Sequence, residues 1–283
     1  MKYRSLLFIP GNAPGMLQNM DILGADAYLI DLEDAVSIEN KDAARLLVKE
    51  FLEHHKPDLP IFVRINPPDT AYFNDDIEAL KYTDITGFML PKAGVESVKS
   101  LDGKLQDTNL SILALIETAR SLEMAFETLG ASKRVEGVLL GAEDLTLDLG
   151  AKRTKASTEI EYARKKIVAA ARAQNVEAID TPWTDTEDLE GLERDALYAE
   201  SLGFTGKALI SPRHTTIVNR VFSPSQEDIQ YALRVFEALK VAKEEGKGAF
   251  SLDGKMVDKP IILRATNVLK QTGDFKEEYD ALL

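Results

Sequence analysis

Acidic residues follow several short apolar segments of this sequence, and they are its side chains best suited to chemistry. They are Asp31, Glu33, Asp34, Glu117, Glu143 and Asp144. Carboxylates gathered at one place repel one another, and their pKa values rise. A divalent cation relieves that repulsion, and ligation by oxygen alone favours Mg²⁺ or Mn²⁺ over Zn²⁺. We therefore predict that Glu117 and Asp144, which end adjacent apolar segments, hold a metal ion; the alternative is that such acids cap the N-termini of helices.

Basic residues follow other apolar segments and are candidates for holding an anionic substrate. They are Arg64, Lys92, Lys207 and Arg213. The planar guanidinium of Arg64 suits a carboxylate, although a salt bridge to Asp31 or Glu33 is the alternative. The residues Gly141, Ala142 and Glu143 add backbone N–H groups for a carboxylate if a helix starts there.

Eight apolar segments are available to bring these residues together. They are Ser5–Ile9, Ala27–Ile30, Ile61–Ile65, Gly87–Leu90, Ser111–Ile116, Gly137–Leu140, Glu177–Ile179 and Lys207–Ile210. Their shortness and continuous apolar character are typical of strands buried on both faces. Apolar residues recur at helical spacing between them, as in Asn40–His54, Thr118–Leu129 and Glu159–Ala173. This alternation predicts an α/β fold, and eight units favour a closed (β/α)₈ TIM barrel over an open doubly wound sheet. The polar strand ends would then meet at its C-terminal mouth.

A C-terminal extension follows the barrel, which we place at residues 1–222. Residues 223–283 are predicted to add helices and a lid segment to the same domain. Ser223 is the expected N-cap of a helix that has Pro224 in its first turn and runs to about Glu245. A hairpin or lid-like loop is expected over Gly248–Lys259, with a last helix from Pro260.

Composition excludes several classes of function. The net charge of −13 opposes nucleic-acid binding. The absence of cysteine excludes disulfides and thiolate chemistry. No apolar run reaches the roughly 18–20 residues of a membrane span, and the N-terminus lacks the features of a secretory signal. We therefore expect a cytoplasmic protein that binds neither nucleic acid nor membrane.

Several motifs resemble those of the citrate lyase beta-chain family. They lie at Arg4–Gly11, Asp31–Val36, Arg64–Asn66, Leu90–Lys92, Gly141–Asp144, Gly206–Arg213 and Asp253–Asp258. The resemblance extends in order over essentially the whole chain. It implies a barrel fold, a Mg²⁺ cofactor and reversible cleavage of a 3-hydroxyacyl thioester.

The resemblance also implies roles for individual residues. Glu117 and Asp144 match the metal ligands of the family, and Arg64 matches the arginine that holds the carboxylate of the oxaloacetate-like product. Glu33 matches an acid near the waters of the metal. Asp258 matches a lid acid that reaches the site of a neighbouring subunit, where we expect proton exchange at the enolate carbon.

Within the family, we expect cleavage of a citryl group on an acyl carrier protein into oxaloacetate and the acetyl carrier. The implied partners are citrate lyase alpha and carrier subunits, and the implied assembly is a homotrimer or larger. The sequence Ser211–His214 departs from that of stand-alone relatives. The carrier of the thioester therefore stays open between the acyl carrier protein and CoA. The alternatives are a stand-alone malyl-CoA or citramalyl-CoA lyase, an aldolase acting on free aldehydes, and a non-catalytic barrel subunit of an assembly.

Overall fold

The computed structural model describes residues 3–55, 58–244, 246 and 250–283. The chain forms two compact units, Met1–Phe222 and Ser223–Leu283. That the second unit belongs to the same domain stays a prediction. Within the described residues, no helix is both long and apolar enough to cross a membrane.

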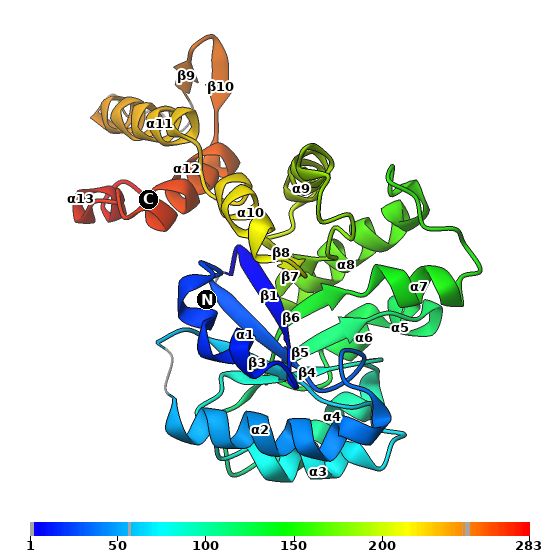
Figure 1. Ribbon diagram of the computed structural model, residues 1–283. Helices are drawn as coiled ribbons and strands as arrows, with labels where there is room; N and C mark the ends of the chain where they lie inside the picture. The colour runs from blue at the N-terminus through cyan, green and yellow to red at the C-terminus, as the bar shows by residue number, and fades with distance from the viewer. Residues whose placement is uncertain (1–2, 56–57, 245, 247–249) are drawn as a thin grey trace. The chain divides into compact units, whose positions relative to one another are not determined.

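A closed parallel barrel forms the centre of the first unit (Figure 1), which confirms the predicted fold class. Its strands are, in order, β1 (Ser5–Pro10), β2 (Ala27–Asp31), β3 (Ile61–Arg64), β4 (Gly87–Leu90), β5 (Ser111–Ile116), β6 (Val135–Leu140), β7 (Glu177–Asp180) and β8 (Gly206–Leu209). Strand β8 pairs with β1, with Lys207 beside Ser5, and this pairing closes the ring. All eight predicted strands are present, and no bound differs by more than two residues.

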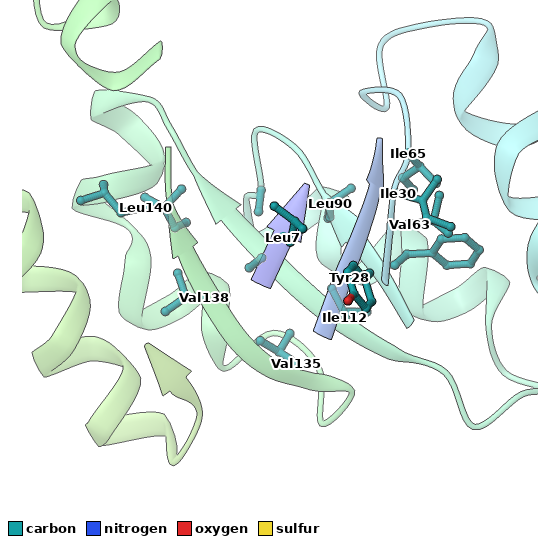
Figure 2. Packing of buried hydrophobic residues seen from close by; sticks show 14 of the residues in the cluster. Leu7, Tyr28, Ile30, Val63, Ile65, Leu90, Ile112, Val135, Val138 and Leu140 are labelled. Carbon is teal, nitrogen blue, oxygen red and sulfur yellow. The ribbon is translucent and has the colours of Figure 1, made fainter. Parts of the chain in front are cut away.

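Alternate side chains of each strand point to opposite sides of the barrel wall. One set fills the barrel interior, and its buried members are Leu6, Ala27, Leu29, Phe62, Met89, Leu113, Leu115, Leu139, Ile179 and Ala208. The other set packs outward against the helices, and Figure 2 shows part of this layer around Leu7, Ile30 and Val63. Because both faces are buried, the strands have continuous rather than alternating apolar sequences.

Helices connect the strands and cover the outside of the barrel. They are α1 (Pro14–Gln18), α2 (Lys41–His54), α3 (Tyr72–Leu80), α4 (Val95–Lys104), α5 (Ala119–Glu123), α6 (Ala125–Leu129), α7 (Ala142–Asp148), α8 (Glu161–Gln174), α9 (Leu189–Leu202) and α10 (Thr215–Val221). The single helix predicted over Thr118–Leu129 is divided into α5 and α6. Met124 causes the division, because its φ of −95° and ψ of 16° interrupt the helical conformation.

The second unit has a small hydrophobic core of its own. Helices α11 (Gln226–Glu244), α12 (Lys259–Thr272) and α13 (Glu277–Asp280) form it together with an antiparallel hairpin of β9 (Phe250–Leu252) and β10 (Lys255–Val257). Val235, Phe236, Val257, Leu269 and Tyr279 are buried in this core. The hairpin lies in the segment predicted as a hairpin or lid. Gly248, where that segment begins, and Glu245, the predicted end of the preceding helix, lie outside the described residues.

The predicted start of α11 needs correction. The backbone N–H of Ser225 donates to Asp228 Oδ2 at 3.0 Å, and the N–H of Asp228 donates to Ser225 Oγ at 3.1 Å. This reciprocal pair is a capping box centred on Ser225 rather than Ser223. Pro224 therefore precedes the helix instead of occupying its first turn.

Candidate active site

The carboxyl ends of the strands form a mouth lined by the residues that continue the inward-facing series. The residues two positions beyond the last interior side chains of six strands are Asp31, Arg64, Glu117, Gly141, Thr181 and Ile210. All of them line one cavity of about 490 Å³, as does Asp144 from the first turn of α7. Strand alternation therefore decides which of the polar strand ends reach the site.

Glu117 is only 2% exposed at the end of β5. Its Oε1 accepts the backbone N–H of Lys92 at 2.7 Å, and Lys92 has a left-handed φ of 47°. Gly141 lies so close that a Cβ atom there would be 2.6 Å from the Cβ of Glu117, so a larger residue would displace the carboxylate. Burial raises the pKa of Glu117 to about 8, and repulsion from Glu33 and Asp144 contributes to the rise. The hydrogen bond from the backbone of Lys92 opposes it.

The guanidinium of Arg64 lies among the acids that follow β2. Its Nε and Nη2 donate to the two carboxylate oxygens of Asp31 at 2.8 and 2.6 Å. Its Nη1 is 2.9 Å from Glu33 and 3.4 Å from Asp34. Burial alone would lower the pKa of Arg64, but the hydrogen bond and charge of Asp31 raise it, so the group stays charged. The salt bridge considered from the sequence is present, and binding of a substrate carboxylate stays a prediction.

Glu33 has an acidity suited to proton transfer. Burial raises its pKa to about 7; Arg64 opposes the rise, and the charges of Asp34 and Asp31 add to it. A carboxyl group with this pKa exchanges a proton near neutral pH, as a general acid or base must. The charge of Glu33 also contributes to the raised pKa of Glu117, so the two carboxylates lie near each other.

Two residues to which the sequence analysis gave no role hold the loop that carries Glu33. Lys41, at the start of α2, donates its Nζ to the carbonyl oxygens of Leu32 and Glu33 at 2.8 and 2.6 Å. Asn66 donates its amide to the same Leu32 carbonyl at 3.1 Å and to Asp76. Nothing in the sequence around Lys41 marks it, because its partners are main-chain atoms.

The other predicted site residues lie at the start of α7. Gly141, Ala142, Glu143 and Asp144 all line the cavity. Glu143 pairs with Arg153 at 3.0 Å, so part of its charge is compensated. Asp144 is exposed and has no ion pair in the described part of the chain.

The donor set at the mouth fits a divalent cation. Asp31 and Glu33 are paired with Arg64, whereas neither Glu117 nor Asp144 is paired with a basic side chain among the described residues. These two carboxylates therefore remain available as ligands. Burial first, and then repulsion from Glu33 and Asp144, raise the pKa of Glu117, and a bound cation would stabilise the charged carboxylate against both. Oxygen donors of this kind suit Mg²⁺.

The metal-free protein is expected to lose stability as the pH rises from about 5 to about 8. Folding raises the pKa values of Glu33 and Glu117 to about 7 and about 8, so the folded state binds more protons than the unfolded state in this range. The stabilisation is present at low pH and is lost as these groups ionise. Thermal unfolding in EDTA at pH 5.5 and 8.5 measures the effect, and Glu117→Gln should flatten it. Identical pH dependence in both proteins would contradict the assignment.

Lys207 does not lie in the mouth, and its predicted role in substrate binding is wrong. It faces outward from β8 and is fully buried, with Nζ 2.6 Å from both Asp180 and Asp195. Arg164 on α8 contacts the same two carboxylates, at 2.8 Å each. The inward series of β8 runs through Ala208 instead, so Lys207 belongs to the layer between barrel and helices.

Removal of the Lys207 charge is expected to be strongly destabilising. Lys207→Met leaves two buried carboxylates facing Arg164 alone, and breaking such a buried pair typically costs about 3–5 kcal/mol. Urea unfolding measures the loss. Lys155→Met is the matched control, because Lys155 also bridges two aspartates, Asp185 and Asp188, but in solvent, where the effect should be small. Equal losses in the two variants would refute this reasoning.

Asp258 lies in the second unit, where it begins α12. Its carboxylate accepts the backbone N–H of Ile261 at 3.4 Å and so acts as the N-cap of that helix. Its predicted action at the site of a neighbouring subunit stays a prediction.

Known proteins resemble this chain over nearly its whole length. Residues 4–212 match the HpcH/HpaI aldolase/citrate lyase family. The citrate lyase subunit beta of Leuconostoc mesenteroides subsp. cremoris is 38% identical over 278 residues, covering 94% of this chain and 92% of that protein. The human mitochondrial citramalyl-CoA lyase is 32% identical over 301 residues, covering 97% of this chain and 87% of that protein.

Solved structures agree with these relatives. The CitE protein of Mycobacterium tuberculosis, in complex with magnesium, acetoacetate and coenzyme A, has a TM-score of 0.82 and 32% identity, covering 96% of this chain and 98% of that one. A citrate lyase beta subunit from the same organism, in complex with oxaloacetate and magnesium, has a TM-score of 0.70 and 31% identity, covering 79% of this chain and 98% of that one.

Proposed function

The chain belongs to the HpcH/HpaI aldolase/citrate lyase family, and from this premise we propose that it is a Mg²⁺-dependent carbon–carbon lyase acting on a 3-hydroxyacyl thioester. The products are a 2-oxo acid and a shorter acyl thioester. One observation carries the proposal: Glu117 and Asp144, which have no basic partner in the described chain, line the same cavity as Arg64. Magnesium accompanies oxaloacetate or acetoacetate in the solved relatives, which supports the choice of metal.

Each residue of the proposed site has its own role in the cleavage reaction. Glu117 and Asp144 hold the Mg²⁺, which when bound polarises the α-hydroxy acid end of the substrate. Arg64 orients the carboxylate of that end, together with Lys92 and the backbone from Gly141 to Glu143. Glu33, with its pKa of about 7, accepts the hydroxyl proton as the carbon–carbon bond breaks. Asp258, acting from a neighbouring subunit, returns a proton to the enolate carbon.

Citryl on an acyl carrier protein is the first candidate substrate, with oxaloacetate and the acetyl carrier as products. It is supported by the similarity to a citrate lyase subunit beta over 94% of this chain. The partners would then be the alpha and carrier subunits of citrate lyase, and the chain would form a homotrimer or a larger assembly.

The wall of the cavity favours a second candidate. Its apolar side is formed by Phe8, Pro10, Met16, Pro182 and Ile210. A citryl group brings a second carboxylate, yet Lys207, one of the cations predicted to bind substrate, is buried behind the barrel wall. An uncharged substituent on the hydroxyl-bearing carbon, as in citramalyl-CoA or malyl-CoA, would pack against this wall without leaving a charge unpaired.

A substrate panel tests both candidates. The purified protein is mixed with the citryl carrier, citryl-CoA, citramalyl-CoA and malyl-CoA, and release of oxaloacetate, pyruvate or glyoxylate is followed with coupled dehydrogenases. Cleavage should require Mg²⁺ and stop on addition of EDTA. If no thioester were cleaved and no Mg²⁺ bound in the presence of oxaloacetate, the proposal would fail in favour of a non-catalytic barrel subunit.

A further inference from the structure

Thr181 is a polar residue of the mouth that the proposed mechanism leaves unused. It follows β7, is 1% exposed and lines the cavity. Its direction is set by its neighbour Asp180, whose carboxylate points outward. Arg164 holds that carboxylate with two hydrogen bonds of 2.9 and 2.8 Å, and Lys207 holds it at 2.6 Å. Because successive side chains alternate, an outward Asp180 turns Thr181 inward.

The hydroxyl of Thr181 has one partner in the described chain. Its Oγ1 accepts the backbone N–H of Ala142 at 3.4 Å, which leaves the hydroxyl proton without a protein acceptor among the described residues. Thr146, on the same helix α7, is different, because its hydroxyl donates to the carbonyl oxygen of Ala142 at 2.8 Å. A buried hydroxyl that donates to nothing costs free energy unless a ligand accepts its proton.

The position of this donor indicates which part of a ligand it meets. Thr181 contacts Ala142, two residues before Asp144, so its hydroxyl lies near the carboxylate expected to hold the metal. Among the described residues that line the cavity, five carboxylates are acceptors, whereas the side-chain donors are those of Arg64 and Thr181. A hydroxyl donor beside the metal ligands suits an oxygen atom that is itself anionic or strongly polarised.

We propose that Thr181 donates a hydrogen bond to an oxygen atom of the acid end of the ligand, the carboxylate or keto oxygen of the 2-oxo acid. This inference rests on the proposed function and adds to it a substrate contact. It also gives the buried Arg164–Asp180–Lys207 group a role in positioning, because that group fixes the residue before Thr181.

Three variants test the contact by equilibrium binding. Thr181→Val removes the hydroxyl and keeps the shape, Thr181→Ser keeps the hydroxyl, and Thr146→Val makes the same change where the proton is already bonded to the backbone. Pyruvate and oxaloacetate are titrated in the presence of Mg²⁺, by calorimetry and by the fluorescence of Trp183, the only tryptophan. Thr181→Val should raise Kd about 10- to 100-fold, the range for a hydrogen bond to a charged group. The other two variants should bind nearly as the wild type does.

Mn²⁺ titration without the acid separates the outcomes. Unchanged Mn²⁺ affinity in Thr181→Val, with weakened acid binding, supports the direct contact. Lost Mn²⁺ affinity would overturn it, because Thr181 would then act only by holding α7. Binding of both acids by Thr181→Val with wild-type affinity would also overturn it. If the wild type itself bound no 2-oxo acid with Mg²⁺, the proposed function would fail first, and the inference with it.

Discussion

Glutamine in place of Glu117 is expected to lower kcat/KM for thioester cleavage roughly a thousandfold and to weaken Mg²⁺ binding. The amide preserves the shape of the side chain beside Gly141 but removes the charge that holds the metal. Lewis-acid stabilisation is worth several kcal/mol, and each 1.36 kcal/mol is about a factor of ten in rate. Steady-state kinetics at several Mg²⁺ concentrations, with calorimetric titration of the metal, measure both effects.

The same substitution should stabilise the protein when metal is absent. In the wild type, Glu117 ionises with a pKa of about 8 in a buried position, which opposes folding at higher pH. Glutamine has no charge to bury, so Glu117→Gln should unfold at a higher urea concentration than the wild type in EDTA at pH 8.5. Glu127→Gln, which makes the same change at an exposed carboxylate on α6, is the control and should change neither property. Near wild-type turnover of Glu117→Gln with Mg²⁺ would mean that Glu117 is not a metal ligand.

The barrel could be predicted from the sequence because each strand has the residue pattern that burial on both faces requires. A parallel strand covered on both faces needs a short continuous apolar run, and Ser111–Ile116 and Ala27–Ile30 are such runs. Helix ends could be predicted less well, because the cap of α11 depends on which serine hydroxyl accepts the backbone N–H of the residue three positions later. The sequence allows either Ser223 or Ser225 as the cap, and the structure shows the reciprocal pair between Ser225 and Asp228.

The site could be predicted in part, for the same reason. Glu117 and Arg64 lie at strand ends, and strand ends of a barrel meet in one mouth. Lys207 also lies on a strand, but one position away from the inward series, and a shift of one residue moves a side chain to the opposite face. The sequence contained the alternation needed to exclude Lys207 and to find Thr181. Ile179 and Ala208 face the barrel interior, so the residues two positions later, Thr181 and Ile210, face the mouth. No such rule leads to Lys41, because only the folded loop brings its amine to main-chain carbonyls.

Lysine in place of Arg64 is expected to lower kcat/KM about a hundredfold while leaving most of the stability intact. The variant keeps a positive charge against Asp31 and Glu33, so no buried carboxylate is left wholly unpaired. It loses the planar fork, which uses Nε and Nη2 on Asp31 and Nη1 on Glu33 and Asp34. Precise placement of an acid depends on such two-point geometry, and loss of orientation can cost about two powers of ten in rate.

The exposed partner of Arg64 shows how the acid could enter. Asp34 is the most distant of the three carboxylates, at 3.4 Å from Nη1, and its side chain is 68% exposed. An incoming carboxylate can therefore replace Asp34 without disturbing Asp31, which accepts from the other side of the guanidinium. Arg64→Lys should accordingly raise the Kd for oxaloacetate measured with Mg²⁺, and Arg45→Lys, where the arginine bridges Asp42 and Asp76 on the helical layer, should not. Equal affinities in all three proteins would assign Arg64 to holding the loop after β2 and leave the acid to another group.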